Sequence, residues 1–247
     1  MFDWTKISSD PCNFEVSKQW QDYYNNKIVR FNLFSELSRD EHLMQLCGMN
    51  GSKIKLLDVG FAEHNLEYAK SAEWFHGKLR ATKKHEIFGL DNNESAVREI
   101  QKHMGFSNCV IGDATDQELL VEGGLFDAIH AGDIIEHLDN VGGFLGFCKK
   151  NLKEDGVIVI TTPNPCTREI IKRAKTFGLL ANLEHTSWVT PSNMNELCRR
   201  FGFIFAESHY IMSKKPTLKN RLREPLIRKM KDVYFNEFIY VIKKSLN

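Results

Sequence analysis

Short apolar runs alternate with helix-like segments through the middle of the chain. Each apolar run stops at a small or acidic residue, after which apolar residues recur at helical spacing. The runs predict strands at residues 54–59, 86–90, 108–111, 126–131 and 156–161. The segments between them predict helices over residues 66–75, 95–104 and 141–152. Strands that alternate with helices are typical of the doubly wound α/β class, a parallel sheet with helices on both faces.

The two ends of the chain carry different patterns. Apolar residues recur at helical spacing over residues 19–49, and residues 1–50 contain no convincing strand. This pattern predicts an N-terminal helical cap that lies on the sheet or over the substrate pocket. Near the other end, Thr190 and Pro191 begin a helix, which two strands follow at residues 203–211 and 235–242. We therefore predict a seven-stranded, mostly parallel sheet in one structural domain, with the cap at 1–50 and the main part at 51–247.

Composition narrows the class of protein without naming a function. Hydrophobic residues make up 42% and charged residues 26% of the chain, which is ordinary for a soluble globular protein. A net charge of +1 argues against a strongly basic nucleic-acid binder. The six cysteines form no CxxC pair, so we expect free thiols and a reducing cytoplasm. Neither a signal peptide nor an apolar run of the ~20 residues that span a membrane is evident in the sequence.

Four acidic residues mark the ends of four predicted strands: Asp58, Asp91, Asp113 and Asp133. In an open α/β sheet, ligands bind beyond the carboxyl ends of the strands. We therefore expect these carboxylates to lie along one edge of the sheet, which is the predicted active site. The alternative interpretation is that they serve only as turn residues and helix N-caps.

The turn after the first strand reads DVGFAEHN and departs from the dinucleotide-binding pattern. Ala62 and Asn65 stand where GxGxxG requires glycine, and Asp91 lies about thirty positions beyond Gly60 instead of roughly 20. A carboxylate at Asp91 suits a ribose diol, and one at Asp113 suits the amino group of adenine. The set therefore favours a nucleoside ligand without phosphates over NAD.

At these motifs the sequence resembles the class I S-adenosylmethionine-dependent methyltransferases. The matching segments are LLDVGFA, GLDNNESAV, IGDATD, FDAIHAGDIIEHL and LKEDGVIVITTPNP, and the resemblance covers roughly residues 50–245. It implies a Rossmann-like methyltransferase fold with S-adenosylmethionine as the cofactor. It also implies cofactor contacts at Asp58, Gly60, Phe61, Ala62, Asp91, Asn92, Asp113, Ala114, Ala131 and Gly132.

The cofactor turn differs from the family pattern D/E-x-G-x-G-x-G at two positions. Ala62 and His64 occupy the places of the second and third glycines. The single methyl group of Ala62 is a small change, whereas histidine does not adopt the positive φ of glycine without strain. We therefore expect this loop to have its own conformation.

A second group of polar residues follows the fourth strand. If a helix begins near Asp133, then Asp133, Glu136 and His137 share one face of it, and His185 follows in a later loop. This combination resembles the small-RNA 3′-terminal 2′-O-methyltransferases and the ubiquinone-pathway O-methyltransferases. The resemblance implies a divalent metal ion (Mg, Mn or Zn) held by Asp133, Glu136, His137 and His185, and catalytic roles for Asp133, His137 and His185.

Hydroxyl chemistry gives this group a function with or without a metal. A hydroxyl must lose its proton to attack a methyl group, and a metal bound to the oxygen lowers its pKa. Without a metal, His137 or His185 would serve as the general base. The alternative is that the Glu-His pair only packs and caps. His130, inside the fourth strand, is expected to be a hydrogen-bonded core histidine.

The segment from Lys214 to Lys231 carries eight Lys or Arg residues against one acidic residue, Glu224. A solvated face is the simple interpretation. Otherwise the segment would meet an anionic partner such as the inner face of a membrane, a phosphorylated lipid carrier, an acidic sugar or RNA. The segment lacks aromatic residues for base stacking, which argues against RNA.

Together these features predict an S-adenosylmethionine-dependent O-methyltransferase that acts on a hydroxyl of a sugar, a glycan or a small polar metabolite. RNA 2′-O-methylation is the alternative within the same class, suggested by the metal resemblance and opposed by the near-neutral charge. A non-catalytic nucleoside- or cofactor-binding partner protein is the alternative from another class, suggested by the irregular cofactor turn. The sequence does not indicate an oligomeric state.

Overall fold

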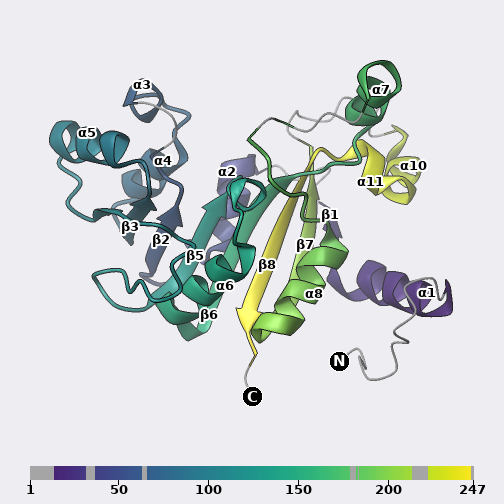
Figure 1. Cartoon of the computed structure of the whole chain (residues 1–247), viewed down its shortest axis with the longest axis horizontal. Helices are drawn as coiled ribbons and strands as arrows, with labels where there is room; N and C mark the ends of the chain where they lie inside the picture. The colour runs from purple at the N-terminus through teal and green to yellow at the C-terminus, as the bar shows by residue number, and fades with distance from the viewer. Residues whose placement is uncertain are drawn as a thin grey trace.

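A twisted sheet forms the centre of the computed structural model, which describes residues 14–31, 37–62, 66–178, 182, 184–212 and 222–245 (Figure 1). The strands are β1 (Val29–Phe31), β2 (Lys55–Val59), β3 (Glu86–Asp91), β4 (Cys109–Ile111), β5 (Phe126–Gly132), β6 (Leu152–Pro163), β7 (Phe203–Ile211) and β8 (Glu237–Lys244). Their order in space is β1-β7-β8-β6-β5-β2-β3-β4. All neighbours pair in parallel except β8, which is antiparallel to β6 and β7. The predicted fold class is confirmed.

Helices cover both faces of this sheet. They are α1 (Phe14–Tyr23), η2 (Tyr24–Ile28), α2 (Arg39–Leu46), α3 (Leu66–Ala69), α4 (Phe75–Ala81), α5 (Glu94–Met104), η3 (Ile135–His137), α6 (Val141–Asn151), α7 (Arg168–Phe177), α8 (Pro191–Phe201), α10 (Glu224–Lys229) and α11 (Lys231–Tyr234). In the view of Figure 1, α6 and α8 lie in front of the sheet and α2 behind it. Neighbouring side chains of β2 point to opposite faces of the sheet. Leu57 lies in one hydrophobic cluster with Phe144 of α6. Leu56 lies in another, with Leu43 of α2 and Leu79 of α4.

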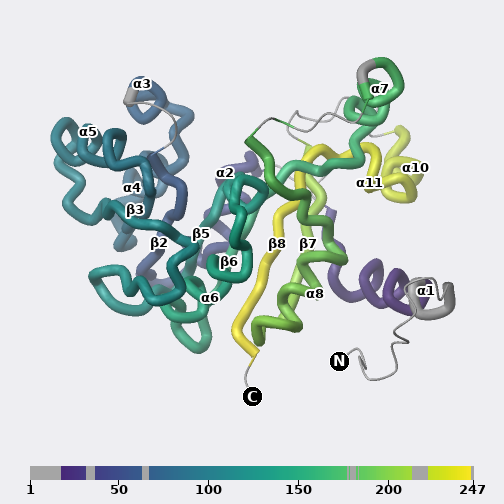
Figure 2. The backbone as a smooth tube through the Cα atoms, viewed as in Figure 1, coloured from purple at the N-terminus to yellow at the C-terminus, as the bar shows by residue number. Residues whose placement is uncertain are grey.

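The sheet has an eighth strand that the sequence did not predict. β1 pairs in parallel with the edge strand β7, so Figure 2 shows this N-terminal segment beside a C-terminal strand. The preceding η2 is tied to β7 as well, because the Tyr24 hydroxyl lies 3.1 Å from Ser208 Oγ and 3.0 Å from the Tyr210 hydroxyl. The expectation of no strand in residues 1–50 is therefore wrong. β1 is three residues long, and its apolar positions also fit the helical spacing of the residues before it.

The predicted helix over residues 66–75 is also wrong in its second half. The chain forms the short helices α3 and α4, separated by a turn in which Trp74 has extended backbone. The Trp74 ring is buried, and its indole Nε1–H donates to the carbonyl oxygen of Phe61 at 2.7 Å. This contact places Trp74 beneath the turn that follows β2, which is incompatible with a continuous helix.

Two expectations about cysteines and membrane spans can be compared with the described part of the chain. Its five cysteines are free thiols, and all except Cys166 are buried. Among the described helices, none combines the length and the apolar character needed to cross a membrane. The parallel strands β2, β3, β4 and β5 all end at one edge of the sheet, and that edge positions the site.

Candidate active site

A cavity of about 490 Å³ opens at the carboxyl ends of β2, β3, β4 and β5. Its volume is in the ~300–1,000 Å³ range of small-molecule sites. Six residues predicted to contact the cofactor line it: Gly60, Asp91, Asn92, Asp113, Ala114 and Gly132. The other lining residues were not among the predicted cofactor contacts: Val59, Leu90, Asn93, Gly112, Asp133, Ile134, His137 and Leu138. The edge predicted from the strand-end acids is therefore a cavity wall.

The turn after β2 requires a glycine at its first position. Gly60 has φ +76°, and a Cβ atom there would lie 2.4 Å from Cγ2 of Ile134. Ala62, in the place of the second family glycine, is fully buried, and its amide N–H donates to Oδ2 of Asp91 at 2.9 Å. The extra methyl group is thus accommodated inside the protein. His64, in the place of the third glycine, lies outside the described residues.

Two of the strand-end carboxylates are fixed by local hydrogen bonds. Asp91 accepts from the amides of Ala62 and Asn93, both at 2.9 Å. Asp113 accepts from the amide of Thr115 at 2.7 Å and from its hydroxyl at 2.8 Å. An ionised carboxylate has about four acceptor positions, so each group keeps capacity for a ligand at the cavity wall.

Asp58 lies behind the cavity wall. Its side chain is buried, with Oδ1 2.6 Å from Nδ1 of His130 and Oδ2 3.0 Å from Nδ1 of His76. Burial raises the pKa of Asp58, but the hydrogen bonds of His130 and His76 more than offset it, so the pKa falls to about 2.

Four of the predicted cofactor contacts lie away from the larger cavity. Asp58 and Phe61 border a second cavity of about 60 Å³, whereas Ala62 and Ala131 are core residues. The structure therefore does not place these four residues on the larger cavity.

Asp133 is held apart from the residues with which it was grouped. It has φ +50°, so the predicted helix does not begin there, and the next turn is the 3₁₀-helix η3. Its Oδ2 accepts from Nη2 of Arg39 at 2.9 Å, and its Oδ1 accepts from the hydroxyl of Thr161 at 2.8 Å. The prediction that Asp133, Glu136 and His137 share one helical face is therefore corrected.

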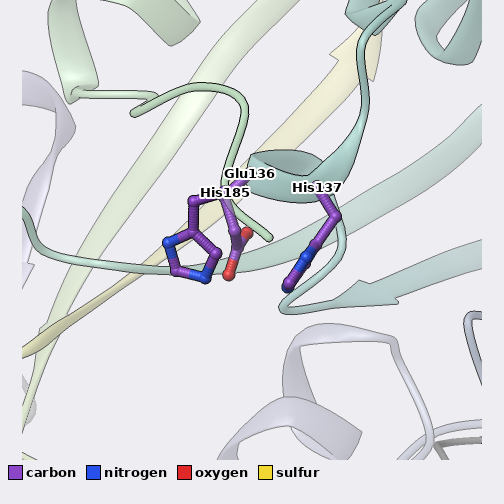
Figure 3. A group of neighbouring side chains, drawn as sticks. All are labelled: Glu136, His137 and His185. Carbon is purple, nitrogen blue, oxygen red and sulfur yellow. The ribbon is translucent and has the colours of Figure 1, made fainter. Parts of the chain in front are cut away.

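The other three residues of the predicted metal site do come together. Each of Glu136, His137 and His185 offers a ligand atom, and these atoms all lie within 4.8 Å of one another. The rings of the two histidines meet edge to face, with centroids 4.8 Å apart. Figure 3 shows the Glu136 carboxylate between the two rings in that view.

The loop that carries His185 is attached to η3 through the main chain. The carbonyl oxygen of Glu136 accepts from the amides of Thr186 at 2.8 Å and Ser187 at 3.2 Å. The ring of His137 is oriented by the same loop, because its Nδ1 lies 3.2 Å from the carbonyl oxygen of Glu184. A carbonyl only accepts, so Nδ1 carries the proton of this bond and Nε2 of a neutral ring is an acceptor.

Burial shifts the titration of two members of this cluster. Glu136 is 1% exposed, and burial raises its pKa to about 7; the nearby carboxylates of Asp133 and Glu237 act in the same direction. Its Oε2 accepts from the hydroxyl of Thr162 at 2.9 Å. The pKa of His185 is lowered, mainly by burial and to a smaller extent by the neighbouring His137, which keeps this imidazole neutral near pH 7.

Comparison with known proteins assigns the family. The sequence model of the family described as "Methyltransferase domain" matches residues 31–207, which is more than half of the chain. The chain belongs to this methyltransferase-domain family. A SAM-dependent methyltransferase from Archaeoglobus fulgidus has a similar solved structure, with TM-score 0.56, 20% identity, and coverage of 84% of this chain and 95% of that one. This likeness supports the fold.

Curated relatives of the methyltransferase are shorter matches. The Ubiquinone biosynthesis O-methyltransferase of Rhodopseudomonas palustris (strain HaA2) is 26% identical over 136 residues, which are 49% of this chain and 51% of the relative. The enzyme of the same name from Caulobacter vibrioides is 33% identical over 81 residues, 32% of each chain. The chain thus spans about half, or less, of the length of these relatives.

The larger cavity fits the cofactor that this family uses. Gly60 and Gly132 let the backbone of its wall pack closely against the side chains behind it, since a Cβ on Gly132 would lie 2.8 Å from Cε1 of His130. Asp91 and Asp113 offer acceptors for a ribose diol and an exocyclic amine along the same wall. These residues would hold S-adenosylmethionine, which supplies an electrophilic methyl group when bound.

The fit of a metal ion to the Glu136 cluster is looser. Ligand bonds of ~2.1 Å place two ligand atoms of one ion at most ~4.2 Å apart. The ligand atoms of this cluster lie within 4.8 Å of one another, a limit slightly above that value, so small side-chain shifts would bring all three to one ion. A carboxylate and two imidazoles are a donor set for Zn or Mn more than for Mg, which prefers oxygen ligands.

Arg39 is the site residue that sequence reasoning missed most completely. It bonds Glu237 through Nε at 2.8 and 3.0 Å, and its Nη2 reaches Asp133 and Thr161. These partners lie 94 to 198 residues away in sequence. Nothing in the local pattern around Arg39 marks it as part of the site.

Replacing Asp58 by Asn should destabilise the methyltransferase in a pH-dependent way. One of the two buried imidazoles would lose its acceptor, which costs about 1–3 kcal/mol in the free energy of unfolding. Because the folded-state pKa of Asp58 is lowered, its ionised form stabilises the fold above about pH 4, and this stabilisation is lost as pH falls toward 2. Chemical denaturation should show the wild-type advantage shrinking below about pH 4. The exposed-pair variant Glu118→Gln should change stability by less than about 0.5 kcal/mol at any pH.

Replacing Asp91 by Ala should weaken binding of S-adenosylhomocysteine. Hydrogen bonds to a charged acceptor contribute about 1.5–3 kcal/mol each, so loss of the carboxylate should raise the Kd roughly tenfold to a hundredfold. Isothermal titration calorimetry measures this, with the exposed neighbour Asp116→Asn as a matched control. An unchanged Kd in Asp91→Ala would place the ligand elsewhere.

Proposed function

We propose that this methyltransferase is an O-methyltransferase whose acceptor is a hydroxyl of a sugar, a glycan or a small polar metabolite. The observation that carries the proposal is the cluster of buried Glu136 with His137 and His185, because His137 also lines the cavity that fits the methyl donor. The name O-methyltransferase of the curated relatives supports an oxygen acceptor.

The cluster provides groups that can take the proton of a hydroxyl. Neutral His137 presents Nε2 as an acceptor, since its Nδ1 faces the carbonyl oxygen of Glu184. His185 stays neutral near pH 7 because burial lowers its pKa. Either imidazole would therefore act as the general base for an acceptor placed between the cluster and the donor cavity. Asp133, which was predicted to be catalytic, lines both cavities. Its role would therefore be toward the bound methyl donor and not toward the acceptor hydroxyl.

A divalent metal ion would be held by Glu136, His137 and His185 in this proposal. Such an ion lowers the pKa of a bound hydroxyl and orients its oxygen. The buried Glu136 carboxyl, hydrogen-bonded by the hydroxyl of Thr162, would provide the negative charge at the ion.

The net charge of +1 favours a small or weakly charged acceptor over RNA, because RNA binding depends largely on cationic contacts to phosphates. A labelled-methyl assay over pools of sugars, lipid-linked glycans, small polar hydroxyl compounds and RNA tests this acceptor class. We expect label in an alkali-stable methyl ether of a small or glycan acceptor. Label only in RNA would favour 2′-O-methylation, and donor binding without any transfer would favour a non-catalytic partner protein.

Replacing His185 by Ala should lower kcat by about 10²-fold, the typical contribution of a general base or of a metal-oriented hydroxyl. Steady-state kinetics with and without a chelator separates the two roles. A chelator effect that disappears in His185→Ala indicates a metal, whereas a chelator-independent loss indicates a base. The exposed residue His103 provides the control variant His103→Ala. Unchanged kcat in His185→Ala would exclude both roles.

Contact with an anionic surface through the segment from Lys214 to Lys231 stays part of the proposal. Residues 214–221 lie outside the described residues. In the described remainder, Leu222 is 80% exposed, and Leu226 and Met230 are exposed near Arg228 and Lys229. Exposed apolar residues among cations suit a peripheral membrane contact.

Vesicle co-sedimentation tests this surface contact. We expect binding to vesicles that contain anionic lipids, and weaker binding after the paired change Arg228→Glu with Lys229→Glu. Neutral vesicles are the lipid control, and equal binding of both proteins to both vesicle types would contradict the contact.

A further inference from the structure

His130 is a buried histidine with one nitrogen satisfied and the other not. The side chain is 4% exposed, and its Nδ1 lies 2.6 Å from Oδ1 of Asp58. Its Nε2 is buried and has no hydrogen-bond partner among the described residues. The other imidazole on Asp58 differs, because Nε2 of His76 lies 3.7 Å from Sγ of Cys109. A buried polar atom without a partner costs about 1–3 kcal/mol, so it calls for a physical explanation.

The His130 side chain borders the smaller cavity, of about 60 Å³. At ~30 Å³ for each water, this space suits a small polar group. Gly132 keeps it open beside the ring, since a Cβ there would lie 3.3 Å from Nε2 of His130. Val59, Gly60, Gly132 and Asp133 line both cavities, so the two cavities adjoin along these residues.

The bond to Asp58 determines what Nε2 can do. The pKa of Asp58 is lowered to about 2, so this carboxylate is ionised and only accepts hydrogen bonds. A neutral His130 therefore carries its proton on Nδ1, and its Nε2 is an acceptor. Asp58 and Asp133 add two carboxylates to the walls of the small cavity. Among the described residues that line it, Arg39 carries a guanidinium, and this group is paired with Asp133 and Glu237.

We propose that Nε2 of His130 accepts a hydrogen bond from the α-ammonium group of S-adenosylmethionine. Asp91 and Asp113 provide for the ribose and the adenine in the larger cavity, which directs the amino-acid end past Gly60 and Gly132 toward the smaller one. His130 is then a donor-binding residue that distinguishes the ammonium end of the cofactor. The inference rests on the proposed donor site.

Isothermal titration with three ligands tests the contact directly. S-Adenosylhomocysteine carries the α-amino group, its deaminated analogue lacks only that group, and 5′-methylthioadenosine lacks the whole amino-acid end. In the variant His130→Asn, the side-chain amide still offers an N–H group to Asp58 near the position of Nδ1. The hydrogen-bond acceptor at Nε2 is lost. We expect about tenfold weaker binding of S-adenosylhomocysteine to this variant, with unchanged binding of the deaminated analogue and of 5′-methylthioadenosine. The variant His130→Gln, whose amide reaches the position of Nε2, should recover part of the loss.

The outcomes separate this inference from the proposed function. If the wild type fails to bind S-adenosylhomocysteine, the donor site itself is wrong. If the wild type binds and His130→Asn weakens all three ligands equally, or none, the ammonium contact is overturned.

A measurement on the wild type covers the case in which the variants do not fold. Nitrogen NMR of ¹⁵N-histidine-labelled protein should show one buried ring with the proton on Nδ1. Its Nε2 signal should shift on addition of S-adenosylhomocysteine and stay in place with the deaminated analogue. Equal shifts with both ligands would overturn the proposal.

Discussion

The guanidinium of Arg39 joins four separate parts of the chain at the active edge of the sheet. It comes from α2 and bonds Glu237 at the start of β8, Asp133 after β5 and Thr161 in β6. Burial raises the pKa of Glu237, so this carboxyl needs a cationic partner to stay ionised. The Arg39–Glu237 pair is partly buried, with side-chain exposures of 32% and 11%, so removing one partner should cost less than the ~3–5 kcal/mol typical of a fully buried pair. The pairing therefore anchors α2 to the sheet and at the same time fixes the direction of Asp133.

The direction of Asp133 divides the edge into two neighbouring sites. Because its carboxylate is held by Arg39 and Thr161, it does not join Glu136, and the chain passes through a left-handed residue into η3. That turn buries Glu136 and leaves His137 on the wall of the donor cavity. The main-chain carbonyl of Glu136 then holds the loop that brings His185. One short segment of backbone thus carries both a residue of the larger cavity's wall and the Glu136 cluster.

The sequence predicted much of the fold because its signals are local. Strands β2, β3, β4 and β5 follow from apolar runs that end at small or acidic residues. Gly60 directly follows β2, Asp91 is the last residue of β3, and Asp113 lies two residues after β4, so their place on the cavity wall depends mainly on the parallel topology. The prediction was wrong where the signal was short or ambiguous. β1 is only three residues long, and the helix over residues 66–75 was interrupted by the buried ring of Trp74.

By itself, the sequence determined the fold class, the edge of the sheet that carries the larger cavity, and the acidic residues that line it. Only the tertiary structure decided which polar groups act together. Asp58 was predicted to contact the cofactor, but it is hydrogen-bonded to two buried histidines, one of them 72 residues away. Asp133 was predicted to bind a metal with Glu136, but it is paired with Arg39, 94 residues away. The carbonyl of Glu136 brought in Thr186 and so His185, across 50 residues. Such partners are set by strand order and by the need to pair buried charge, and neither leaves a pattern in the neighbouring residues.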